Sequence, residues 1–247
     1  YQKDLSLAIK GDSSTRHIAV LSASPRHEKD LGLGQWSDIA NYHIYPSKRK
    51  PDGAPFATEL DRRILSAPEF FPGKPVVLSE SAYQRAYKEN PGVDDGTHAR
   101  GTMTIYAEAF RAGIERTYIY RFHELHDMPH SEGYGFIRDL EPTPTWFAVK
   151  NMVDILKDES KKDFKPGRLA YSITGPDMEI RSILLQESSG AFYLLAWMVG
   201  DIWNETENRP VINKGDAELR FTTPPGKFEI YDPIKSNSPI GTSAPGK

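Results

Sequence analysis

Cysteine is absent from this chain of 247 residues, so disulfide bonds and thiol chemistry play no part in its fold or its function. No apolar run approaches the ~20 residues that a membrane-spanning helix needs. The net charge is −3, which argues against nucleic acid or an anionic membrane as the main partner. We therefore expect a globular protein with no nucleic-acid partner and no membrane partner.

The composition is otherwise ordinary for a globular chain, with 38% hydrophobic and 26% charged residues. The length suffices for one large domain or two smaller ones. Aromatic residues make up 11% of the chain, including twelve Tyr and four Trp. Aromatic rings suit sugar-binding clefts and ordinary cores equally, so composition alone does not choose a function.

Helical and strand patterns alternate over the first 160 residues. Short apolar strands stopped by turn residues are predicted at 17–25, 38–46, 74–81 and 114–122. Helical spacing is predicted at 2–10, 56–67, 96–113 and 143–158. Within the third helix the apolar stripe is expected at Met103, Tyr106, Ala107 and Phe110. This alternation predicts a parallel sheet or barrel.

The pattern changes near residue 164, after which strands follow one another without helices. Five runs have strand character: 168–174, 179–188, 191–199, 217–223 and 227–233. Turn signals such as Gly175-Pro176 and Ser189-Gly190 separate them. An antiparallel β-sandwich is therefore predicted. The expected boundaries are 1–160 for the α/β part, 161–235 for the sandwich and 236–247 for a flexible tail rich in Ser, Pro and Gly.

The third predicted strand ends on a carboxylate, Glu80. A buried carboxylate costs several kcal/mol unless it is paired or hydrogen-bonded, so Glu80 either faces water or is held in a site. Alternate strand residues share a face. We expect Val76, Leu78 and Glu80 to lie on the same inner face as His43 and Tyr45, which end the second strand. Sites in barrels lie at this carboxyl-terminal rim.

Four segments carry a resemblance to a known family: "NYHIYP", "KPVVLSES", "GTMTIYAEAFRAGIERTYIYRF" and "GYGFIRDLEPTPTWFAVKNMVDIL". They resemble consecutive pieces of the clan A glycoside hydrolases, retaining enzymes on a (β/α)8 barrel, many with a C-terminal β-sandwich. The resemblance covers roughly residues 1–235. It implies an α/β fold class, half of a (β/α)8 TIM barrel (strands five to eight) followed by an antiparallel β-sandwich. It also favours a secreted or periplasmic location.

The resemblance implies a carbohydrate substrate and a site that needs no metal or organic cofactor. Glu80 matches the catalytic nucleophile, and His43 and Tyr45 match rim residues that position it. Retaining hydrolysis needs a second carboxyl group about 5 Å away as the acid/base. The Asn-Glu pair that carries it in the family is not found before the first strand, and Glu124 is a candidate substitute. An aromatic platform for the sugar would come from Tyr120 or Phe122, and the remaining candidate substrate contacts are Tyr120 and His123.

Simpler interpretations stay open at this point. Glu80 can be an ordinary rim acid that caps a helix or pairs with Arg85, and His43 an ordinary hydrogen-bonded histidine. Three histidines on the loop after the fourth strand fit no standard zinc spacing and favour a solvated loop over a metal site: His123, His126 and His130. The rival function is a non-catalytic protein that binds a glycan or a protein partner on a truncated glycosidase scaffold.

The predicted strands leave a barrel open, because closure in this fold takes eight strands. Strands 17–25 and 114–122 are then edges with unpaired backbone groups, which invite association. We therefore predict a homodimer, or a companion chain that completes the barrel. Sedimentation of the purified chain should show association. A stable monomer that unfolds cooperatively without a partner contradicts this prediction.

Overall fold

The computed structural model describes residues 1–24, 32–46, 56–86, 92–124, 133–159, 163–175, 179–204, 206–211, 216–222 and 226–243. These residues form two compact units, which are described separately. The first unit comprises Tyr1–Tyr83 and Ile105–Arg121, and the second comprises Gln84–Thr104 and Phe122–Lys247. None of the helices in the described ranges has the length and apolar character required to cross a membrane.

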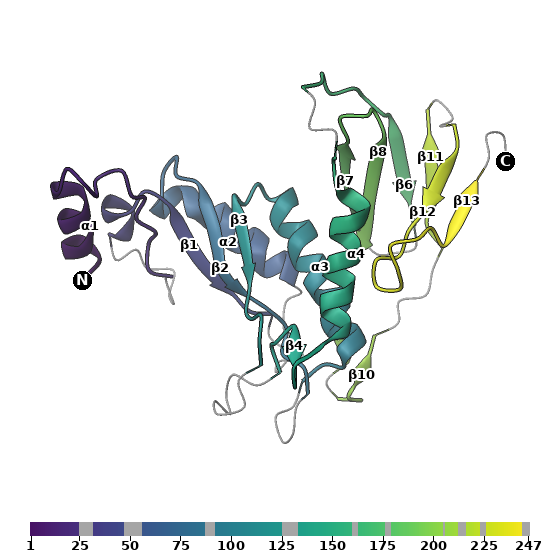
Figure 1. The fold of residues 1–247 in the computed structure, drawn as a ribbon, viewed down its shortest axis with the longest axis horizontal. Helices are drawn as coiled ribbons and strands as arrows, with labels where there is room; N and C mark the ends of the chain where they lie inside the picture. The colour runs from purple at the N-terminus through teal and green to yellow at the C-terminus, as the bar shows by residue number, and fades with distance from the viewer. Residues whose placement is uncertain are drawn as a thin grey trace. The chain divides into compact units, whose positions relative to one another are not determined.

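The first unit is built on a parallel sheet of three strands in the order β1-β2-β3 (Figure 1). The strands are β1 (Ala40–Ile44), β2 (Val76–Ser81) and β3 (Arg116–Ile119), and all pairings are parallel. The segment predicted as the first strand contributes a single parallel bridge, between Leu21 and Ile39. The prediction of parallel strands is confirmed for these three. The described strands form no closed barrel, so the half-barrel stays a prediction.

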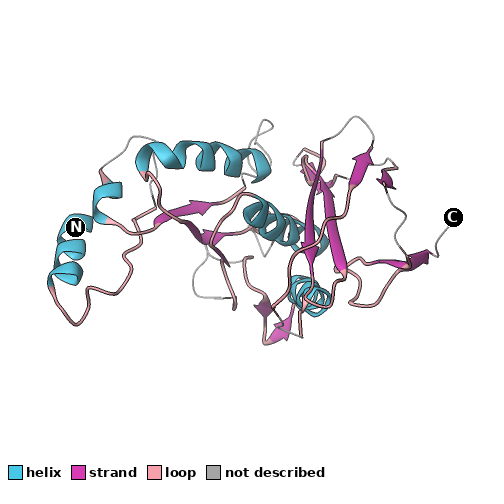
Figure 2. Cartoon of the chain, turned by 90° about the horizontal axis from the view of Figure 1, so that it is seen from above, coloured by secondary structure: helices cyan, strands magenta, loops and turns pink. Residues whose placement is uncertain are grey.

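Helices accompany the strands as the alternation predicts. They are α1 (Gln2–Gly11), the short 3-10 helix η1 (Leu33–Trp36), α2 (Phe56–Phe70) and α3 (Asp95–Arg111), whose last part belongs to the first unit. Helix α2 lies along one face of the sheet (Figure 2). The core between sheet and helices contains Ala40, Tyr42, Ile44, Leu60, Ala67, Phe71, Leu78, Ile105 and Ala109.

The expected facing of β2 is wrong for two residues. Leu78 is fully buried in the core, and Val76 packs against it, so both side chains face the helices rather than His43. The register of β1 and β2 shifts between Tyr42 and His43, where Tyr42 pairs with Leu78 but His43 pairs with Glu80. The extra residue in β2 is Ser79. This β-bulge, and not simple alternation, brings Glu80 opposite His43.

The buried stripe of α3 also differs from the expected one. Phe110 is 61% exposed, whereas Ile105 and Ala109 are fully buried in the core. Burial therefore follows a neighbouring stripe of the helix, which includes Ile105 and Ala109. The hydrophobicity of the helix sequence alone does not reveal which stripe faces the sheet.

The second unit contains α4 (Pro144–Leu156) and antiparallel strand pairs. The longest pair joins β7 (Ile180–Gln186) to β8 (Phe192–Met198), and β6 (Tyr171–Thr174) pairs with β11 (Glu218–Phe221). The other pairs are short: β4 (Ile137–Arg138) with β5 (Glu141–Pro142), β9 (Trp203–Asn204) with β10 (Arg209–Pro210), and β12 (Phe228–Ile230) with β13 (Gly241–Ser243).

All five predicted strand runs after residue 164 contain strands, which confirms the change from alternating to antiparallel structure. Their packing as a sandwich stays a prediction, because each described sheet in this unit has two strands. Strand β13 lies inside the range 236–247 for which the sequence predicts a tail.

Helix α2 offers a matched test of the core. Leu60 is fully buried, whereas Leu65 on the same helix is 82% exposed. We expect Leu60→Ala to lower the free energy of unfolding by about 2–5 kcal/mol, because it leaves a cavity. Leu65→Ala should change it by less than about 0.5 kcal/mol. Urea unfolding of both variants measures the difference, and equal effects would contradict the described core.

Candidate active site

Glu80, at the end of β2, meets two side chains from the end of β1. The hydroxyl of Tyr45 donates a hydrogen bond of 2.8 Å to Glu80 Oε2. Nδ1 of His43 lies 3.3 Å from the same oxygen. The side chains of His43 and Glu80 are each 36% exposed, so the carboxylate remains open to solvent. Three of the predicted site residues therefore come together.

Ser79 completes this group, and the sequence did not point to it. Its Oγ lies 2.9 Å from Nε2 of His43, so the imidazole touches Ser79 at one nitrogen and Glu80 at the other. Two consecutive side chains of β2 reach the same histidine because of the bulge at Ser79. β-Bulges commonly re-aim side chains next to active sites.

A polar frame beneath the site fixes the strand that carries His43. The side chain of buried Asn41 donates to the Ser22 carbonyl at 3.2 Å and accepts from the Ser79 N–H at 3.2 Å. The backbone N–H of His43 donates to Ser24 Oγ at 2.8 Å. These bonds tie β1 to the chain on both sides. Serine side chains that accept backbone N–H groups carry no distinct sequence signal, and this frame was not predicted.

Tyr120, another predicted residue, reaches the same end of the sheet. Its backbone N–H donates to the Ser81 carbonyl at 3.1 Å. Its ring meets that of Tyr45 edge-on, with centroids 6.4 Å apart. The guanidinium of Arg121 lies over the Tyr120 ring at 5.3 Å and donates to its hydroxyl at 3.2 Å. An aromatic surface and a cation thus lie next to the Tyr45–Glu80 pair, and Arg121 was not predicted.

Glu124 lies in the second unit, in surroundings that do not suit contact with a substrate. It is fully buried and accepts hydrogen bonds from the N–H groups of Gly133 (2.5 Å) and Gly135 (2.8 Å) and from the Arg85 guanidinium (3.1 Å). Gly133 has φ 87°, and a Cβ there would lie 2.4 Å from the Arg85 carbonyl oxygen. We therefore assign Glu124 a structural role in place of the expected substrate contact or acid/base.

The contacts of Arg85 bear on the simpler interpretation in which Glu80 is an ordinary acid that pairs with Arg85. Arg85 pairs with Glu124 and with Asp95, at 3.1 and 3.0 Å, whereas the contacts of Glu80 are with Tyr45 and His43.

His123 also lies in the second unit, exposed, with its backbone paired to Ile137 in an isolated bridge. His126 and His130 fall outside the described residues. Within the described ranges, no three metal-ligating side chains cluster in a way that could hold a metal ion.

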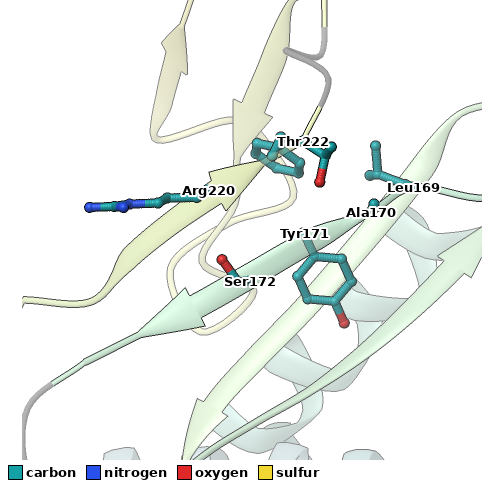
Figure 3. Close-up of a pocket in the computed structure, with 7 residues that line it drawn as sticks. Leu169, Ala170, Tyr171, Ser172, Arg220 and Thr222 are labelled. Atoms are coloured by element: carbon teal, nitrogen blue, oxygen red, sulfur yellow. The ribbon is translucent and has the colours of Figure 1, made fainter.

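A cavity of about 360 Å³ lies elsewhere in the second unit, along β6 and β11 (Figure 3). Its lining residues are Leu169, Ala170, Tyr171, Ser172, Arg220, Phe221 and Thr222. Ser172 pairs with Arg220 and Tyr171 with Phe221, so the two pairs lie on opposite faces of the ladder. Arg220 is bound by Glu218 and the Tyr171 hydroxyl by Ser182. The lining includes none of the predicted site residues.

Comparisons with known proteins give no family. No family model matches the chain, and no curated protein matches it. A solved family GH2 β-galacturonidase from Eisenbergiella tayi is 19% identical and covers 60% of this chain and 28% of its own, with a TM-score of 0.47. A family 17 β-1,3-glucanosyltransferase from Rhizomucor miehei is 12% identical and covers 58% of this chain and 55% of its own, at 0.47.

A β-glucuronidase from Bacteroides uniformis is 13% identical and covers 89% of this chain and 30% of its own, at a TM-score of 0.42. The chain spans less than a third of the length of the two β-galacturonidase chains it matches. These structures are carbohydrate-active enzymes by name. Their TM-scores lie below 0.5, so the functional argument rests on the site geometry alone.

The charged cluster around Arg85 in the second unit gives a pH-dependent prediction. Burial raises the pKa of Asp95, but the hydrogen bond from Arg85 and the charge of Arg138 outweigh burial and hold the pKa below its usual value. A carboxyl group with a lower pKa in the folded state stabilises the fold above its unfolded-state pKa, and this contribution is lost as the pH falls through the folded-state pKa.

We therefore expect the wild-type chain to be more stable than Asp95→Asn at neutral pH. The difference in unfolding free energy should stay constant down to about pH 5 and shrink below about pH 4, near the unfolded-state pKa of aspartate. Urea unfolding of both proteins across this range measures it. A difference that does not change with pH would show that the two arginines do not act on Asp95 as described.

Proposed function

We propose that this chain carries the nucleophile part of the active site of a retaining glycoside hydrolase. The observation that carries the proposal is the contact of Glu80, at the carboxyl end of a parallel strand, with both Tyr45 and His43. This is the end of a parallel α/β sheet at which substrates bind. A solvent-accessible carboxylate with two fixed neighbours is arranged to act as a nucleophile.

In this mechanism the Glu80 carboxylate attacks the anomeric carbon of the sugar. The bond from that carbon to the leaving-group oxygen breaks as an acid/base residue protonates the oxygen, and a covalent glycosyl–enzyme ester forms. Water, deprotonated by the same acid/base, then attacks the anomeric carbon and releases Glu80. Tyr45 and His43 hold the carboxylate in place throughout, and the Tyr120 ring offers an apolar surface to the sugar.

The second carboxyl group is proposed to come from a second copy of the chain or from a companion chain that completes the barrel. Glu124 does not suit the role, because it is fully buried and already accepts three hydrogen bonds. The same observation favours the alternative function. If no acid/base reaches Glu80, the site can bind a glycan or a protein without cleaving it.

Glu80→Gln tests the proposed nucleophile. The amide is isosteric but a poor nucleophile, so hydrolysis of activated aryl glycosides should fall by about 10³-fold or more. Glu69→Gln is the matched control, because Glu69 is exposed on α2 in the same unit and should keep full activity. Initial rates on a panel of 4-nitrophenyl glycosides, with thermal melting to confirm folding, give the result. Full activity of Glu80→Gln rejects the assignment, whereas glycan binding by a wild-type chain without hydrolysis supports the binding protein.

A further inference from the structure

The two oxygens of the Glu80 carboxylate differ in their contacts. Both neighbours contact Oε2, with Tyr45 Oη at 2.8 Å and His43 Nδ1 at 3.3 Å. Among the described residues no hydrogen bond or ion pair reaches Oε1. Oε2, which accepts the hydrogen bond from Tyr45, is the less nucleophilic of the two oxygens, and it is also the one whose position is fixed.

His43 stabilises Oε2 only if its proton lies on Nδ1. An ionised carboxylate accepts hydrogen bonds and donates none, so a bare Nδ1 facing Oε2 would place two lone pairs against each other. In the neutral imidazole one nitrogen donates and the other accepts. With the proton on Nδ1, Nε2 of the neutral ring is an acceptor, and a donor at Nε2 favours this tautomer.

Ser79 is the group that meets this requirement. Its Oγ lies 2.9 Å from Nε2 of His43, and a serine hydroxyl can donate to it. Both residues of this contact are held in place through their backbone N–H groups. The Ser79 N–H is bound by Asn41 Oδ1, and the His43 N–H donates to Ser24 Oγ. Continuing the regular pairing of Tyr42 with Leu78 would also place Ser79 opposite His43, and the bulge in β2 adds Glu80 to the same histidine.

We propose that Ser79 is a positioning residue that fixes His43 in the tautomer with its proton on Nδ1, so that Oε2 of Glu80 is anchored and Oε1 is the attacking oxygen. The attack by Oε1 rests on the proposed glycosidase function. The tautomer of His43 does not, and it can be measured in a chain without any activity.

The first measurement is ¹⁵N NMR of the full chain labelled at its seven histidines, with the His43 signals identified by their loss in His43→Gln. At a pH where a titration shows His43 to be neutral, we expect the proton on Nδ1 and none on Nε2. Ser79→Ala should lose this preference, and Ser79→Thr, which keeps a hydroxyl, should retain it. A proton on Nε2 in the wild type, or unchanged ring signals in Ser79→Ala, would overturn the proposal.

Ser81→Ala is the matched control, because Ser81 lies on the same strand and its hydroxyl donates to the Ile44 carbonyl rather than to His43. It should leave the His43 signals unchanged, even where it lowers stability. If Ser81→Ala changes the His43 tautomer as much as Ser79→Ala does, the change reflects a general loosening of β2, and the proposed role of Ser79 is overturned.

The second measurement is steady-state hydrolysis of an activated aryl glycoside. Loss of one positioning hydrogen bond should lower kcat by about tenfold in Ser79→Ala with KM unchanged, and Ser79→Thr should restore it. A changed tautomer with unchanged kcat would overturn the positioning role. If the wild type hydrolyses no glycoside at all, the proposed function fails, while the NMR result still decides whether Ser79 sets the tautomer.

Discussion

The register shift between β1 and β2 is the constraint on which the candidate site depends. Up to Tyr42 and Leu78 the strands pair residue by residue, and this regular part buries its side chains against α2 and α3. Beyond it, one extra residue in β2 lets Ser79 and Glu80 both reach His43. The same pair of strands therefore builds an apolar core at one end and a polar cluster at the other.

The sequence predicted the elements better than their faces. Apolar periodicity located the helices and the parallel strands, and Pro and Gly marked their ends, because these signals are local. The sequence predicted the wrong face of the sheet for Val76 and Leu78, because strict alternation cannot anticipate a bulge. It also chose the wrong stripe of α3, because burial of Ile105 and Ala109 depends on which helix face the sheet approaches.

For the site, residue type and strand position sufficed to group Glu80, His43, Tyr45 and Tyr120, whereas other roles required coordinates. Ser79 was missed because an isolated serine carries no pattern. The burial of Glu124 was not predicted, because an acid after a strand looks the same in sequence whether it faces solvent or is buried. Its buried carboxylate is held by donors that no local pattern reveals, the distant Arg85 and the nearer Gly133 and Gly135.

The buried cluster of Arg85, Glu124, Gly133 and Gly135 limits which substitutions the protein can accept. Arg85 and Glu124 are buried as an ion pair, and replacing Arg85 would leave the Glu124 carboxyl group without its ionic partner. A side chain at Gly133 or Gly135 would collide with the backbone of Arg85 or of Glu124. We therefore expect a single substitution at any of these positions to destabilise the fold. The four positions should drift together or stay fixed, while exposed surface positions vary independently.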